Sequence, residues 1–133
     1  MNLVTNIEKY LLTAKIDFPA SLELLSEDVV WINRLPEHVP FSGEYHGRAG
    51  VAQYFQRLAE NFVLGEHNLN EYDFIQTEDT LVMVGCEKGG KALPTGKVFD
   101  LEFVWVVRFD EQGRIKYLRE HNDTAAIGDA FKT

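Results

Sequence analysis

Cysteine, long apolar runs and basic side chains are all scarce in this chain. The single cysteine, Cys86, excludes an internal disulfide framework. No apolar stretch approaches the roughly 20 residues that a membrane-spanning helix needs. The 21 Asp and Glu residues outnumber the 13 Lys and Arg residues and leave a net charge of −8. Because nucleic-acid binding needs clustered basic side chains, we expect neither a nucleic acid nor a membrane as a partner.

The N-terminal stretch also lacks the basic and apolar regions of a secretory signal peptide. Together with the single cysteine, this favours a cytoplasmic protein. The chain has 133 residues, of which 45% are hydrophobic, enough for one globular domain with its own core. We therefore predict a single domain over residues 1–133. The four histidines show no metal-ligand spacing, and no glycine-rich nucleotide loop follows a strand, so we expect neither a metal nor a cofactor.

Apolar spacing predicts that helices come first and strands follow. One helix should run to about Lys15, and a longer amphipathic helix should cover Gly47–Phe62. Asp17 is a candidate N-cap for a short helix over Ala20–Leu25, and Asp123 or Thr124 could cap a last helix through Phe131. Arg34–His46 should be an irregular loop, and the expected strands are Asp28–Asn33, about His67–Gln76, Leu81–Lys88, Lys97–Phe109 and Arg114–Asn122.

This order of elements is an α+β pattern. A curved antiparallel sheet wrapped on the Gly47–Phe62 helix would enclose a cavity on its concave side. In the strand over Val98–Phe109 the odd positions are all apolar and should form the buried face. The even positions still include Val98, Val104 and Val106. We therefore expect a homodimer that covers the outer sheet face.

Three segments carry a resemblance to a known family: Gly43–Arg48, the hairpin over Val107–Ile115, and Arg119–Asp123. Together they resemble the nuclear-transport-factor-two-like superfamily, and within it the SnoaL-like and ketosteroid-isomerase-like group, over nearly the whole chain. The resemblance implies a cystatin-like cone with shorter N-terminal helices beside the long one, a hydrophobic pocket and usually a homodimer. Function varies widely on one fold, so the pocket residues must be weighed individually.

Ketosteroid isomerases are one comparison within this group. The resemblance implies an Asp base after the first strand, with a Tyr and a protonated Asp as oxyanion donors. Here those positions fall at Asn33, Tyr10 and near Trp105. An amide cannot take a proton from carbon, and an indole does not replace the missing acid. Steroid isomerase chemistry of that type is therefore not expected.

Limonene epoxide hydrolases are a second, partial similarity. Those enzymes hold a water with an Asp on the last strand, an Asn and a Tyr, and an Arg and a further Asp complete the relay. The similarity places Glu120, Asn33 and Trp31 at the first three positions. Cys86 and Lys88 fall at the other two, so Lys88 is a candidate substitute for the general acid. The segments that carry this similarity are Lys91–Lys97 and Trp31–Asn33.

Glu120 is the leading catalytic candidate. On a pocket wall a carboxylate loses solvation, which raises its pKa toward the range that is useful for proton transfer. If Glu120 faces inward, Leu118 and Asn122 do so too, whereas the opposite register would place their odd-numbered neighbours inside. The alternative role is a strand-end carboxylate paired with a nearby Arg or Lys.

Asn33 is the second catalytic candidate, because its amide could orient a water or accept a ligand hydroxyl. Its plainer role is to end a strand and satisfy loop backbone. The lining side chains are equally expected as plain core unless a void remains. The candidate substrate-binding residues are Trp31, Tyr10, Tyr54, Lys88, Phe99, Leu101, Phe103, Trp105, Leu118 and Asn122.

Three functional hypotheses follow. The first is a metal-free isomerase, cyclase or hydrolase that acts on a small, mostly apolar molecule through acid–base chemistry at Glu120. The second is a non-catalytic module that holds a small hydrophobic ligand, which the incomplete catalytic sets favour. The third is a dimeric interaction module whose interior is merely packed core.

Overall fold

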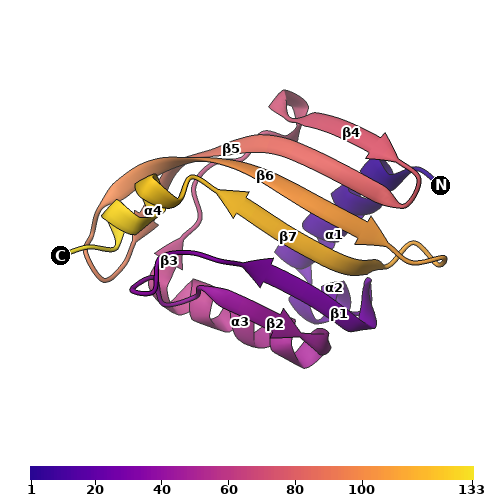
Figure 1. Cartoon of the computed structure of the whole chain (residues 1–133), viewed down its shortest axis with the longest axis horizontal. Helices are drawn as coiled ribbons and strands as arrows, with labels where there is room; N and C mark the ends of the chain where they lie inside the picture. The colour runs from indigo at the N-terminus through magenta and orange to yellow at the C-terminus, as the bar shows by residue number, and fades with distance from the viewer.

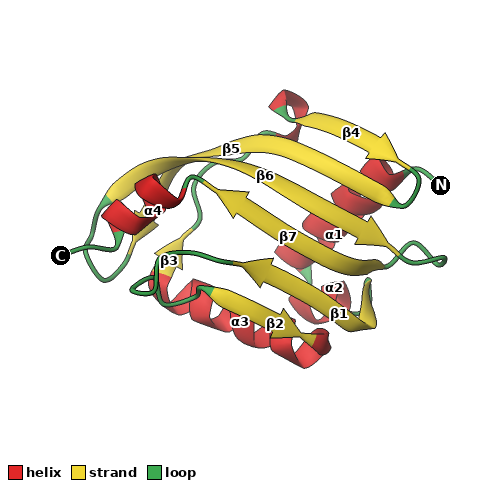
Figure 2. Cartoon of the chain, viewed as in Figure 1, coloured by secondary structure: helices red, strands yellow, loops and turns green.

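The strands form a strongly curled sheet, and helices cover its inner face (Figure 1). The computed structural model describes residues 1–133, and Figure 2 separates its helices, strands and loops by colour. The helices are α1 (Leu3–Ile16), α2 (Phe18–Leu22), α3 (Gly47–Asn61) and α4 (Thr124–Ala130), with a short 3-10 turn η1 (Leu69–Glu71). The strands are β1 (Leu25–Asn33), β2 (Gly43–His46), β3 (Phe62–Val63), β4 (Asp73–Thr77), β5 (Thr80–Ala92), β6 (Val98–Phe109) and β7 (Ile115–Asn122).

The strand order is β2-β1-β7-β6-β5-β3, with β4 added beside β5. All but one of the strand pairs are antiparallel; β1 and β7 run parallel. The α+β class and the curled, cystatin-like architecture are confirmed, but the expectation of a wholly antiparallel sheet was wrong. The parallel pair arises because the chain returns to β1 from the far end of the sequence and inserts β7 at the centre of the sheet.

The helix ends follow the capping chemistry of the sequence. The Asp17 side chain accepts a hydrogen bond from the backbone of Ala20 at 3.2 Å, and Asp123 caps α4 in the same way. Both predicted caps are confirmed. The short helix begins and ends earlier than the predicted Ala20–Leu25, because Leu25 already belongs to β1.

Two strand predictions needed correction. The predicted loop over Arg34–His46 ends in β2, which pairs with β1 and buries Tyr45; the prolines that suggested a loop lie only in its first part. The strand expected over about His67–Gln76 begins at Asp73, because Asn68 caps η1 with its side chain. A register shift between Glu87 and Gly90 marks a bulge where β5 pairs with β6.

The two faces of β6 differ as the alternation predicted. Its odd positions, from Leu101 to Phe109, contribute to the buried core. On the outer face Val82 pairs with Val106 and Val84 with Val104, so β5 and β6 share a stripe of partly exposed valines. No helix is both long and apolar enough to cross a membrane.

Candidate active site

The parallel pairing of β1 with β7 brings the two catalytic candidates side by side, because Asn33 is the register partner of Glu120. Glu120 faces the interior. Its Oε2 accepts a hydrogen bond from the Trp31 indole at 2.9 Å and another from the Tyr54 hydroxyl at 2.6 Å. The register left open by the sequence is therefore the one that turns Glu120 inward.

A chain of amides supports the Tyr54 hydroxyl. The Asn33 amide nitrogen donates to the Tyr54 oxygen at 3.0 Å. The Asn122 amide nitrogen in turn donates to the Asn33 carbonyl oxygen at 2.9 Å. Because the Tyr54 oxygen already accepts from Asn33, its own proton points at Glu120. The network thus fixes the orientation of the Glu120 carboxyl through donors from three elements, namely β1, β7 and α3.

Burial controls the electrostatics of this network. It raises the pKa of the Glu120 carboxyl, while the hydrogen bonds from Tyr54 and Trp31 act in the opposite direction. Burial and the Glu120 charge together raise the pKa of the Tyr54 hydroxyl well above its ordinary value, so Tyr54 stays a donor. Both causes also raise the pKa of Tyr10, whose buried hydroxyl has no hydrogen-bond partner.

Aromatic rings pack around Glu120. The Trp31 ring lies 5.8 Å from both Tyr54 and Trp105, and 6.0 Å from Tyr10, measured between ring centroids. Trp31 has no exposed surface, whereas Trp105 and Glu120 are partly exposed. Trp105 is therefore the one ring of these four that reaches the surface. Leu118 is fully buried beside this cluster, while Phe99 and Leu101 lie further along β6, away from Glu120.

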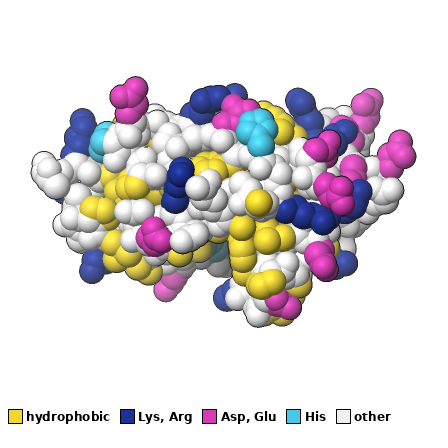
Figure 3. All heavy atoms as spheres, turned by 90° about the horizontal axis from the view of Figure 1, so that it is seen from below, with side chains coloured by type: hydrophobic (Ala, Val, Ile, Leu, Met, Phe, Trp, Pro, Cys, Tyr) yellow, Lys and Arg dark blue, Asp and Glu magenta, His cyan; other side chains and the backbone are white.

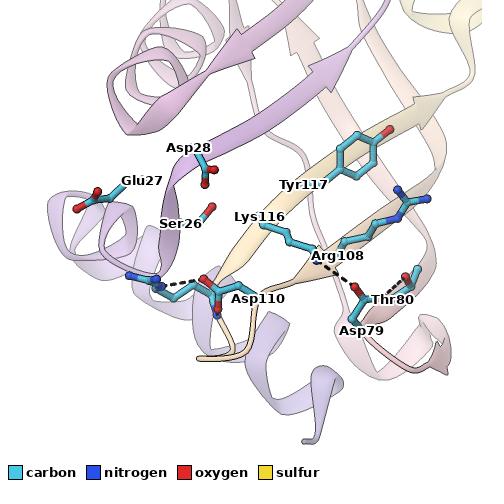
Figure 4. A pocket seen from close by; sticks show the side chains of 10 residues that line it. Ser26, Glu27, Asp28, Asp79, Thr80, Arg108, Asp110, Lys116 and Tyr117 are labelled. Carbon is cyan, nitrogen blue, oxygen red and sulfur yellow. Dashed lines mark hydrogen bonds and ion pairs between the residues drawn. The ribbon is translucent and has the colours of Figure 1, made fainter.

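No open hydrophobic pocket accompanies this cluster among the main hollows. One hollow of about 1120 Å³ lies where β1 separates from β7, and polar and charged side chains line it (Figure 4). A smaller one of about 430 Å³ lies beside Lys88 and Gly89. From below, hydrophobic side chains reach the surface in separate groups among charged ones (Figure 3). The predicted hydrophobic pocket therefore stays a prediction.

Lys88 is not brought to this site. It is exposed, and it pairs through its backbone with Glu66. Its neighbour Glu87 is the residue that faces inward, with 4% of its surface exposed. Sequence reasoning missed Glu87, although the signal was present: Leu81 and Met83 are buried, and the same alternation continues to position 87.

Glu87 forms a second polar cluster with two residues that sequence reasoning had also left aside. Its Oε1 lies 2.8 Å from His67 Nε2. His67 Nδ1 lies 2.6 Å from the Tyr72 hydroxyl, which donates to the Cys86 carbonyl at 3.2 Å. No group of three or more His, Cys, Asp or Glu side chains is arranged to hold a metal. Acid–base and hydrogen-bonding chemistry is what these side chains themselves can supply.

Comparison with known proteins shows which proteins share this fold. The family model described as a SnoaL-like domain matches residues 11–118. An NTF2-like protein from Burkholderia xenovorans LB400 is 21% identical, with a TM-score of 0.85 over 98% of this chain and 95% of that chain. A candidate isomerase from Bacillus subtilis is 19% identical, with a TM-score of 0.78 over 98% and 96% of the two chains.

A candidate polyketide cyclase from Pseudomonas putida KT2440 is 16% identical, with a TM-score of 0.77 over 98% of each chain. A structure from Xanthomonas campestris, 23% identical with a TM-score of 0.74 over 98% of each chain, is described as having a cystatin-like fold. Comparison with curated proteins gives no match. At these identities the solved structures establish the shared fold and leave the reaction to the residues of this chain.

Proposed function

We propose that this chain, which belongs to the SnoaL-like domain family, binds a small, mostly apolar molecule beside Glu120 and moves a proton on it. The observation that carries the proposal is the inward-facing Glu120 carboxyl, held by Trp31 and Tyr54 among aromatic rings. The reaction classes that fit are isomerisation, cyclisation and hydrolysis by acid–base chemistry. A solved relative described as a candidate isomerase and another described as a candidate polyketide cyclase are consistent with this range.

Both hydrogen bonds to Glu120 end on Oε2, which leaves Oε1 as the oxygen for a substrate proton. In the proposed step, Oε1 takes a proton from an acidic C–H or O–H bond, and the electron pair of that bond stays on the substrate. The neutral carboxylic acid then returns the proton to another atom. Burial favours the neutral acid, so the protonated state of Glu120 is less costly here than in water. Asn33 acts through Tyr54 and is therefore a positioning residue.

A small apolar ketone tests this proposal. We expect the protein to accelerate exchange of the α-hydrogens of 2-tetralone with deuterium in D2O, followed by proton NMR. Glu120→Gln should slow that exchange by about 10²-fold or more, which is the usual contribution of a positioned general base. Glu102→Gln, on the exposed outer face of β6, is the matched control and should exchange like the wild type. Equal rates in the wild type and Glu120→Gln would refute proton transfer by Glu120.

A non-catalytic ligand-binding module is the second candidate function. The incomplete catalytic set favours it, because Lys88, the candidate general acid, is exposed and lies away from Glu120. Native mass spectrometry of the purified protein would reveal a retained small molecule, and that molecule should raise the melting temperature when added back. Binding without any chemical change in the molecule would support this function over an enzymatic one.

We also propose that the outer valine stripe on β5 and β6 mediates a homodimer. Val84 is 38% exposed although it lies in the middle of a sheet face, and its partner Val104 is partly exposed too. The solution mass should be twice the 15.2 kDa of one chain. Val84→Lys should shift it to the monomer, whereas Leu12→Lys on exposed α1 should leave it unchanged. A monomeric wild type would exclude this dimer.

A further inference from the structure

Glu87 carries a buried carboxylate oxygen that no group of the protein satisfies. Its side chain belongs to the inner face of β5, where it is the register partner of Leu101. Oε1 is paired with His67, but Oε2 is buried and has no hydrogen-bond partner. An unsatisfied buried polar atom costs about 1–3 kcal/mol, and more when it is charged. A donor from outside the chain, either a buried water or a group of a ligand, would satisfy this oxygen.

The partners of His67 show which positions around Glu87 are already occupied. His67 Nε2 lies 2.8 Å from Glu87 Oε1, and His67 Nδ1 lies 2.6 Å from the Tyr72 hydroxyl. The protein therefore pairs one oxygen of the carboxyl and leaves the other, Oε2, for a donor such as a hydroxyl. Burial raises the pKa of Tyr72, which keeps its hydroxyl protonated.

Glu87 and Glu120 share one interior. Their register partners on β6 are Leu101 and Trp105, four residues apart, which is about 13 Å along a strand. Phe103 lies between them on the same face, and its ring is 6.0 Å from the Trp105 ring. The Glu87 charge contributes to raising the pKa of Glu120. One elongated molecule could therefore meet both carboxyl groups.

Gly90 makes room for Oε2 at its end of the interior. A Cβ atom at this position would lie 2.7 Å from Oε2 and 2.6 Å from the Phe62 ring, so a larger residue would have to displace these side chains. Phe62 packs against the partly exposed Phe99, with ring centroids 5.6 Å apart. Both rings therefore lie near this end of the interior, and Phe99 is the more exposed of the two.

We propose that Glu87, held by His67, is a second ligand-binding residue that accepts a hydroxyl from the end of the ligand remote from Glu120. The inference rests on the proposed function, because it concerns the same ligand. It narrows the ligand class to elongated, mostly apolar molecules with a hydroxyl donor at the Glu87 end and a reacting group at the Glu120 end.

Naphthalene-2,6-diol and 2-naphthol are suitable probes, because they differ by one hydroxyl. We expect calorimetric titration to show that the wild type binds the diol about 10-fold or more tightly than 2-naphthol, the usual effect of one hydrogen bond to a charged group. Glu87→Gln should remove that preference, since its amide nitrogen donates instead of accepting. Glu66→Gln, which removes an exposed charge nearby, should retain it.

The outcomes separate this inference from the proposed function. A diol preference that survives in Glu87→Gln but is lost in Glu120→Gln overturns the role of Glu87 and leaves that of Glu120 standing. Loss in Glu87→Gln, with the preference retained in Glu120→Gln, supports Glu87 as the acceptor of the second hydroxyl, while the hydrogen-exchange assay tests Glu120 separately. A wild type without preference, or without measurable diol binding, overturns the inference.

A second measurement needs no variant and guards against misfolding of Glu87→Gln. In wild-type protein with 13C-labelled glutamate, the assigned Glu87 carboxyl resonance should shift when the diol is added. A shift confined to Glu120 would overturn the inference even if every variant failed to fold.

Discussion

The two inward-facing carboxyl groups, Glu120 and Glu87, differ in their hydrogen-bond partners. Glu120 receives neutral donors from Trp31 and Tyr54 on a single oxygen. Glu87 is held by a histidine that is itself about one-third exposed, and its other oxygen is buried without a partner. Neutral donors leave a carboxyl free to change its protonation state, whereas a cation stabilises the ionised form. The difference suits Glu120 to proton transfer and Glu87 to recognition.

Trp31→Ala should cause the largest loss of stability, because it removes the main support of the Glu120 carboxyl. The substitution removes a fully buried indole and one of the two donors to Glu120, so we expect a loss of about 3–5 kcal/mol in unfolding free energy. Equilibrium unfolding in urea measures it. Trp105→Ala is the matched control and should cost less, because Trp105 is partly exposed. Equal losses in the two variants would contradict the central role of Trp31.

His67→Phe should cause a smaller loss of stability, through the Glu87 carboxyl. It leaves the buried Glu87 carboxyl without its histidine partner, and we expect a loss of about 1–3 kcal/mol in unfolding free energy at pH 7. Adding Glu87→Gln to this variant should recover part of the loss, which urea unfolding of both single variants and the double variant would show. His121→Phe, at an exposed position on β7, should change stability by less than about 0.5 kcal/mol. A double variant that is the least stable of the three would show that Glu87 does not depend on His67.

The smallest expected effect is on the pH dependence of the unfolding free energy, which also distinguishes Glu120 from other carboxyl groups. Burial raises the pKa of Glu120 in the folded state, so folding favours its protonated form. This contribution is full below the pKa of the unfolded carboxyl and is lost as the pH rises through the higher folded value. Wild type should therefore lose stability relative to Glu120→Gln as the pH rises above about 4, the ordinary range of a glutamate carboxyl, and urea unfolding measures this loss. Glu102→Gln should show no such trend, and a trend of opposite sign in Glu120→Gln would mean that hydrogen bonding outweighs burial.

Local sequence patterns were enough to predict much of this fold. The alternation along Val98–Phe109 identified the buried face of β6, and short polar side chains at Asp17 and Asp123 identified two helix starts. These features depend on residues close in sequence, where steric and hydrogen-bonding rules act directly. The resemblance of three segments to the SnoaL-like group then supplied the overall architecture that the family match confirms.

The site depended on information that local pattern does not contain. The inward register of β7 was undecided because apolar and polar residues occur on both of its faces. It is set by Trp31, which lies 89 positions away in the sequence. Lys88 came from the resemblance to epoxide hydrolases, whereas the alternation from Leu81 and Met83 turns its neighbour Glu87 inward. The roles of Glu120 and Asn33 in binding or catalysis stay predictions that the variants above can test.

The central position of β7 has a consequence for synthesis in the cell. Strand β1 needs β7 on one side, yet β7 ends only at Asn122. At about 5–20 residues per second, a ribosome takes seconds to translate the intervening chain. During that time β1 presents an open edge that invites pairing with other chains. The nascent N-terminal half is therefore the segment for which a chaperone that shields unpaired strands should matter most.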